Sequence, residues 1–178
     1  MQPSSPPTSF FLGVLFLCFN VDYQILWGDL TEEVLKDGSQ FYTTFFNAPP
    51  AIKALLHGMM GVGLLAGVYK LNVWDESAMF FDGSSLAAYV FAIVVYLSVV
   101  IPGLRTVADP VKDVDTKEDQ IEALRVASAG NIIMIACLTL VLLLQAGQEY
   151  ARRVDAKALA KAQQQVAVEP TAKKEKKQ

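Results

Sequence analysis

The residues Val126–Ala146 read VASAGNIIMIACLTLVLLLQA and contain no charged side chain. A membrane-spanning helix needs about 20 mostly apolar residues, because each residue adds about 1.5 Å and the hydrocarbon core is about 30 Å thick. This stretch meets that length without an interruption. The sequence therefore predicts a transmembrane helix over 126–146.

Two stretches upstream have the same character. Ile52–Leu71 has lysines only near its ends, at Lys53 and Lys70, where their ammonium groups can snorkel towards the membrane interfaces. Ser84–Ile101 has no formal charge. We expect Pro102-Gly103 to end that helix, because proline lacks a backbone donor and glycine loosens the backbone.

A fourth apolar stretch, near the N-terminus, is shorter. Phe10–Val21 would cover only about 18 Å as a helix, so a span over about 9–27 requires Asp22 to be tolerated near an interface. A half-span and a cleaved signal peptide are the alternatives. The signal peptide is disfavoured, since no basic residue precedes Lys36 and no A-x-A cleavage site is present. A missing upstream stretch would also explain the shortness.

Composition supports a membrane protein and argues against several other classes. The 178 residues are 53% hydrophobic and 19% charged, where a soluble domain has about 25% charged residues. One histidine, His57, and two cysteines, Cys18 and Cys137, are too few for a His/Cys metal cluster or a disulfide framework. The net charge of −3 argues against nucleic-acid binding. No nucleophile elbow, zinc-protease or phosphate-loop motif is present, so we expect no enzymatic activity and no cofactor.

The distribution of basic residues predicts the orientation in the membrane. Short cytoplasmic segments hold the excess of lysine and arginine, and the tail after Gly147 holds eight of the chain's fifteen basic residues. They are Arg152, Arg153, Lys157, Lys161, Lys173, Lys174, Lys176 and Lys177. With four crossings, both termini are then cytoplasmic, and the first and third loops are lumenal. We expect a membrane domain over 1–147 and a lysine-rich cytoplasmic tail over 148–178, helical over Gln148–Val168, ended by Pro170 and disordered after it.

Small and polar residues within the predicted spans are candidates for contacts between helices. Gly61, Gly63 and Gly67 lie in the second span, and Ser128 and Asn131 lie in the fourth. Membrane helices associate through close packing of small residues and through hydrogen bonds. These residues either hold the four helices to one another or remain open to the helix of a client protein. Asn131 needs a partner in either case, because an unpaired amide in hydrocarbon costs several kcal/mol.

The chain resembles the fungal Shr-type packaging chaperones of the endoplasmic reticulum, which assist amino-acid permeases. The segments that carry the resemblance are Phe11–Val14, Asp22-Tyr23 with Leu26, Pro49-Pro50, Gly61–Leu64 with Gly67, Ser84–Leu86, Tyr89-Val90 with Ala92-Ile93, Ala127-Ser128, Asn131–Ile133 and Leu144-Gln145. They occur in collinear order, and the lysine-rich end is similar to the family's cytoplasmic tail. The resemblance covers roughly residues 10–147.

The four predicted spans make an all-α, polytopic bundle of four transmembrane helices. The resemblance implies that this bundle chaperones permeases without catalysis. The spans would hold nascent permease segments in the bilayer, and the tail would meet vesicle-coat components. Independently, Lys174 and Lys176 fit a K-x-K-x-x retrieval signal at the end of the chain, although a generic lysine-rich terminus is an equal alternative. The rival functions are a small transporter or channel subunit and a cargo-sorting adaptor that acts through its tail.

Overall fold

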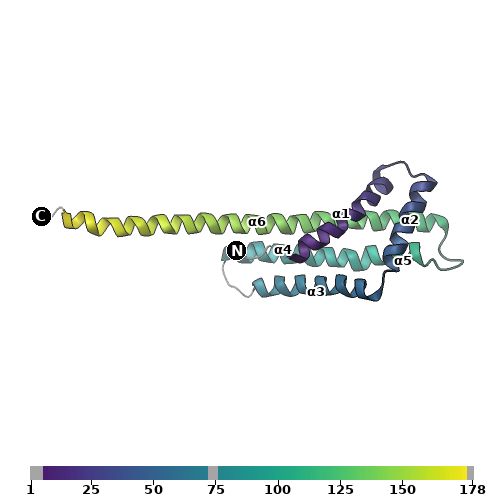
Figure 1. The fold of residues 1–178 in the computed structure, drawn as a ribbon, viewed down its shortest axis with the longest axis horizontal. Helices are drawn as coiled ribbons and strands as arrows, with labels where there is room; N and C mark the ends of the chain where they lie inside the picture. Colours follow the sequence, from purple (N-terminus) through teal and green to yellow (C-terminus); the bar gives the residue numbers. More distant parts are fainter. Residues whose placement is uncertain (1–5, 72–75, 176–178) are drawn as a thin grey trace.

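The computed structural model describes residues 6–71 and 76–175, and it describes side chains for 6–71 and 79–163. Every regular element in the described residues is helical. The elements are α1 (Pro6–Trp27), α2 (Glu32–Phe46), α3 (Pro50–Leu71), α4 (Glu76–Val95), the π-helix η1 (Tyr96–Val100), α5 (Ile101–Ala108) and α6 (Lys117–Glu175). In Figure 1 they form an elongated bundle from which the C-terminal part of α6 projects.

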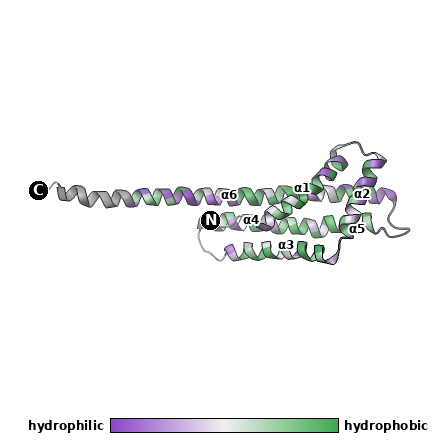
Figure 2. Ribbon diagram, viewed as in Figure 1, coloured by the Kyte–Doolittle hydropathy of each residue, from purple (hydrophilic) through white to green (hydrophobic). Residues whose placement is uncertain are grey.

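Four helical segments of the described residues are long and apolar enough to cross a membrane. They are Pro6–Trp27, Pro50–Leu71, Met79–Ala108 and Lys117–Gln163. The all-α, four-span prediction is therefore confirmed. The first span reaches its 22 residues because α1 starts at Pro6, before the apolar run. Prolines suit the first turn of a helix, where the backbone N–H groups have no intrahelical partner. Figure 2 shows hydrophobic residues along the bundle and hydrophilic residues on α6 where it leaves the bundle.

The last helix, α6, is the longest element and the one against which most of the other helices pack. Its 59 residues correspond to about 88 Å, nearly three times the hydrocarbon thickness. It runs beside α1 and α4, and the three form the largest packed interface of the fold (Figure 1). Its start is fixed by a capping box, in which the Thr116 N–H donates to Asp119 Oδ2 at 2.9 Å and the Asp119 N–H donates to Thr116 Oγ1 at 3.2 Å.

The helical tail extends further than the sequence predicts. The expected end at Pro170, with disorder from Thr171, is wrong as far as Glu175, because α6 passes through the proline. An interior proline removes one hydrogen bond and costs about 3 kcal/mol, but the alanine, lysine and glutamate residues around it favour helix. Residues 176–178 lie outside the described residues. The predicted boundary between 147 and 148 falls within this continuous helix and stays a prediction.

The expected helix end at Pro102-Gly103 is also wrong, because the chain remains helical to Ala108. The π-helix η1 precedes the proline, and the Ile101 N–H donates to the Tyr96 carbonyl across its wider turn. Pro102 then lies in the first turn of α5, directly after the wider turn of η1, which accommodates a residue without a backbone N–H. Gly103 allows close approach of α6, since a Cβ there would lie 3.0 Å from the Ala123 carbonyl oxygen.

The first loop contains a helix that sequence reasoning missed. Helix α2 lies across one end of the bundle and packs against α1, α5 and the start of α6 (Figure 1). Thr31 caps it, accepting a 3.3 Å hydrogen bond from the Val34 N–H. Glu32 and Glu33 in its first turn complement the positive end of the helix dipole. The face that carries Tyr42 is buried against the bundle.

Candidate functional site

Three polar side chains from distant parts of the sequence meet inside the bundle. Asn131 Nδ2 of α6 donates to Asp22 Oδ2 of α1 at 3.1 Å and to the Tyr42 hydroxyl oxygen of α2 at 2.8 Å. The Tyr42 hydroxyl in turn donates to Asp22 Oδ1. The exposed fractions of Asp22, Tyr42 and Asn131 are 0%, 1% and 3%. This polar cluster connects α1, α2 and α6. Of the two roles expected for Asn131, it therefore fills the one that holds the helices of the bundle to one another.

The protonation of Tyr42 fits its role as a donor. Burial, and then the neighbouring Asp22 carboxylate, raise the pKa of the Tyr42 phenol above its ordinary value. The hydroxyl therefore stays protonated and can donate to the carboxylate. Ser128 is completely buried on α6, one turn before Asn131. Neither Asn131 nor Ser128 presents its side chain on the surface of the bundle.

A second polar contact lies near the opposite end of the bundle. Gln148 Nε2 of α6 donates to Asp82 Oδ2 of α4 at 2.7 Å, and both residues are buried. Ser85 of α4 is buried nearby, beside a small cavity that Thr8 of α1 also lines. Polar pairing thus fixes α6 to α1 at one end and to α4 at the other.

The glycines of α3 divide into two opposite faces. A Cβ at Gly63 would overlap the Tyr89 hydroxyl, and one at Gly67 would lie 2.8 Å from Leu86 Cδ1 of α4. These two glycines therefore serve internal packing, which the 3.4 Å hydrogen bond from the Tyr89 hydroxyl to the Met60 carbonyl supports. On the other face, nothing lies within 4 Å of a Cβ built at Gly58 or Gly61.

One face of α3 is largely exposed. No residue of α3 is classed as buried, and the exposed fraction of Leu65 is 71%. At 100° per residue, Leu65 and Val68 fall on the same side of the helix as Gly58 and Gly61. We call these four residues the outer face of α3. Of the five predicted contact residues, only Gly61 belongs to it.

A cavity of about 290 Å³ lies between α1 and α3. Residues from α2, α4, η1, α5 and α6 also line it. His57 of α3 is among the lining residues, and its Nδ1 is 2.7 Å from the Lys53 carbonyl oxygen. A carbonyl only accepts, so Nδ1 carries the proton. Within the described residues, no group of three or more His, Cys, Asp or Glu residues is placed to hold a metal ion.

The predicted retrieval lysines are Lys174 and Lys176. The backbone of Lys174 is helical and belongs to the last turn of α6, whereas Lys176 lies outside the described residues. Sequence reasoning missed Tyr42 as a member of the polar cluster, and it did not predict that the Asp22 side chain would be buried. The amphipathic spacing of Gly38 and Tyr42 in α2 is the signal that would have found the first of them.

The fold and the polar pairs define a polytopic helical membrane protein with buried hydrogen bonds between its helices and one helix exposed along its outer side. The family model described as ER membrane protein SH3, the SHR3 chaperone family, matches residues 6–178. The chain belongs to this family of endoplasmic reticulum membrane chaperones. Neither a curated protein nor a solved structure matches the chain.

Proposed function

We propose that this chaperone assists the folding of amino-acid permeases in the endoplasmic reticulum membrane and readies them for vesicle export. Reversible contacts between transmembrane helices are the proposed mechanism. A partly inserted permease exposes small-residue faces and polar groups that would otherwise pair wrongly. A bundle with a free helix face can occupy them, and contacts of about 1–2 kcal/mol or less leave the association reversible.

The observation that supports this proposal is the free outer face of α3. Gly58 and Gly61 would let the backbone of a client helix approach closely, and Leu65 and Val68 would pack beside it. Gly63 and Gly67, on the opposite face, already pack against α4. Client contact is therefore assigned to Gly61 and its neighbours rather than to Asn131 or Ser128, which the bundle uses internally.

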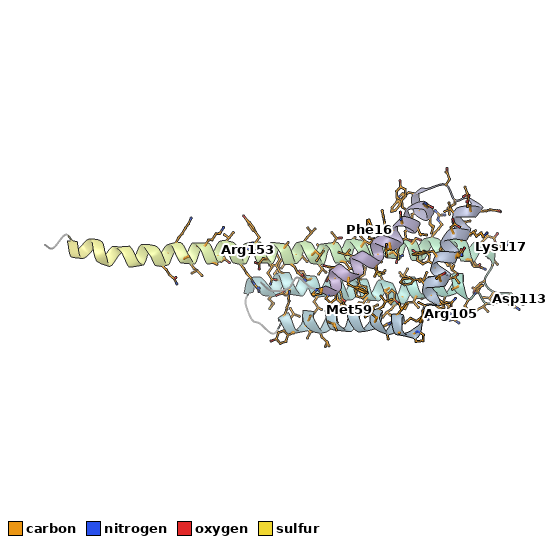
Figure 3. The ribbon with its side chains drawn as sticks, in the orientation of Figure 1. Phe16, Met59, Arg105, Asp113, Lys117 and Arg153 are labelled. Atoms are coloured by element: carbon orange, nitrogen blue, oxygen red, sulfur yellow. The ribbon has the colours of Figure 1, made fainter. Side chains whose placement is uncertain are left out.

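The proposed orientation places both termini in the cytoplasm. Arg152 and Arg153 follow the membrane part of α6, on the segment that leaves the bundle (Figure 3). Asp113 and Lys117 lie at the other end, which would be lumenal together with α2 (Figure 3). The tail would then be available to vesicle-coat components, and Lys174 and Lys176 to a retrieval receptor.

A leucine at Gly61 tests the assignment of the client surface. Gly61→Leu should lower permease delivery to the cell surface by up to about tenfold, since it blocks the close approach worth about 1–2 kcal/mol. Gly13→Leu is the matched control, because Gly13 of α1 is also open, with nothing within 4 Å of its Cβ. Equal permease delivery with both variants, at equal chaperone abundance, would exclude the outer face of α3 as the client surface.

A further inference from the structure

A cavity of about 290 Å³ between α1 and α3 is lined by residues of α3 other than the four of its outer face. A single flexible hydrocarbon chain can enter such a space. The cavity therefore offers a site for an occupant other than the helix proposed for the outer face of α3.

Most of the lining surface of the cavity is apolar, although His57, Asn131 and tyrosines of α2, α4 and η1 also line it. Its walls include Phe11 and Val14 of α1, Leu56 and Met60 of α3, and Met134 of α6. Water gains little in such a space, because it needs two to four polar partners. An empty cavity would leave its lining atoms without contacts on one side. Since α3 is exposed to the membrane along its length, lipid chains are the nearest material that can fill it.

One cation lies at the edge of this apolar lining. Lys53, in the first turns of α3, lines the cavity, and its Nζ lies 5.3 Å from the centroid of the Phe46 ring. No aspartate or glutamate is among the residues that line the cavity. Lys53 is also close to the membrane interface, where phosphate groups of lipids are found. The combination of an apolar cavity and a marginal lysine matches a phospholipid, with its chain inside and its phosphate at the ammonium group.

We infer that the cavity between α1 and α3 binds one acyl chain of a phospholipid, and that Lys53 at its edge favours an anionic headgroup. This lipid would fill the space between α1 and α3 that helix packing leaves open. The site involves residues of α3 that are different from the four residues of the outer face proposed for clients. The inference is therefore independent of the proposed function, and either can fail without the other.

The test uses the purified full-length chain reconstituted in phosphatidylcholine vesicles. Trace phosphatidic acid or phosphatidylcholine would carry a photoactivatable group in one acyl chain, and labelled peptides would be mapped after irradiation. We expect labelling to concentrate on cavity-lining segments of α1 and α3. Phosphatidic acid should label about fivefold more than phosphatidylcholine, as expected for one lysine near an anionic phosphate.

Two pairs of variants separate a bound lipid from lipid that merely surrounds the protein. Leu56→Trp fills the cavity and should remove most labelling, whereas Leu65→Trp, on the outer face of α3, should leave it unchanged. Lys53→Gln should abolish the preference for phosphatidic acid, while Lys70→Gln, at the other end of α3, should preserve it.

Three results would overturn the inference. Labelling spread evenly over the lipid-facing residues and insensitive to Leu56→Trp would mean surrounding lipid only. A preference for phosphatidic acid that survives Lys53→Gln would show that Lys53 does not select the headgroup. Loss of lipid labelling of the cavity when a purified permease is co-reconstituted would assign the cavity to the client. Because Lys53 is exposed, Lys53→Gln keeps the test valid even if Leu56→Trp fails to fold.

Discussion

Helices α3 and α6 are both apolar membrane spans, yet the bundle uses them differently. Within an apolar 18-residue segment of α6, 39% of the residues are buried, whereas no residue is buried in the corresponding segment of α3. Helix α6 packs against α1, α4, η1 and α5 and has polar partners at two levels. Helix α3 packs chiefly against α4. Apolar length alone therefore identifies a span, while burial distinguishes the helix that holds the bundle together from the helix that stays exposed.

The largest effect should come from breaking the polar cluster that anchors α6. Asn131→Leu removes two hydrogen bonds and leaves Asp22 and Tyr42 without this donor. We expect the free energy of unfolding to fall by about 3 kcal/mol, the upper end for buried groups left unsatisfied. Thermal unfolding in detergent and the cellular abundance of the chaperone would show this loss. Ile133→Leu, at an exposed position of the same helix, should change neither, and equal stability of both variants would contradict the structural role of Asn131.

The four spans and the need of Asn131 for a partner could be predicted from the sequence, because both follow from local chemistry. Unbroken apolar runs predict membrane helices, and an amide in hydrocarbon must form hydrogen bonds. The partners of Asn131 could not be predicted, since Asp22 is 109 residues away and Tyr42 lies in a helix hidden within a polar loop. The passage through Pro102 depends on a π-turn, which no composition rule announces.

The faces of α3 were likewise beyond sequence reasoning. Gly61, Gly63 and Gly67 look equivalent in a string of small residues, but only packing shows which of them meets α4. A helical-wheel count separates Gly61 from the other two by more than 100°, although it cannot say which side faces the bundle. The distinction required the position of Tyr89 and Leu86.

An intermediate effect should follow from separating α3 from its neighbour. Gly63→Leu forces a side chain into Tyr89 and should cost about 1–3 kcal/mol, as overpacking does. The loss should be smaller than for Asn131→Leu, because α3 contacts fewer elements than α6. Protease sensitivity of the purified protein would report the loosened helix. Gly58→Leu, which places leucine on the open face of the same helix, should leave protease sensitivity as in the native chain; a matching increase would mean that both faces of α3 are packed.

The smallest effect on the bundle should come from removing the projecting part of α6. Deletion of 154–178 removes residues that follow the Gln148–Asp82 contact between α6 and α4 and keeps Arg152, so we expect unchanged thermal unfolding of the membrane bundle in detergent. A chaperone that acts through its spans should still keep permeases from aggregating, which sedimentation of detergent extracts would measure. Complete loss of that protection would instead favour an adaptor that sorts cargo through its tail.

The most direct measurement compares α3 with α6 in the cell. A photo-cross-linking residue would replace Leu65 of α3, which is 71% exposed, or Leu143 of α6, which is 65% exposed. We predict that newly made amino-acid permeases cross-link to position 65 and only weakly to position 143. Equal cross-linking at both positions, or cross-linking at 143 alone, would contradict the assignment of client contact to the outer face of α3.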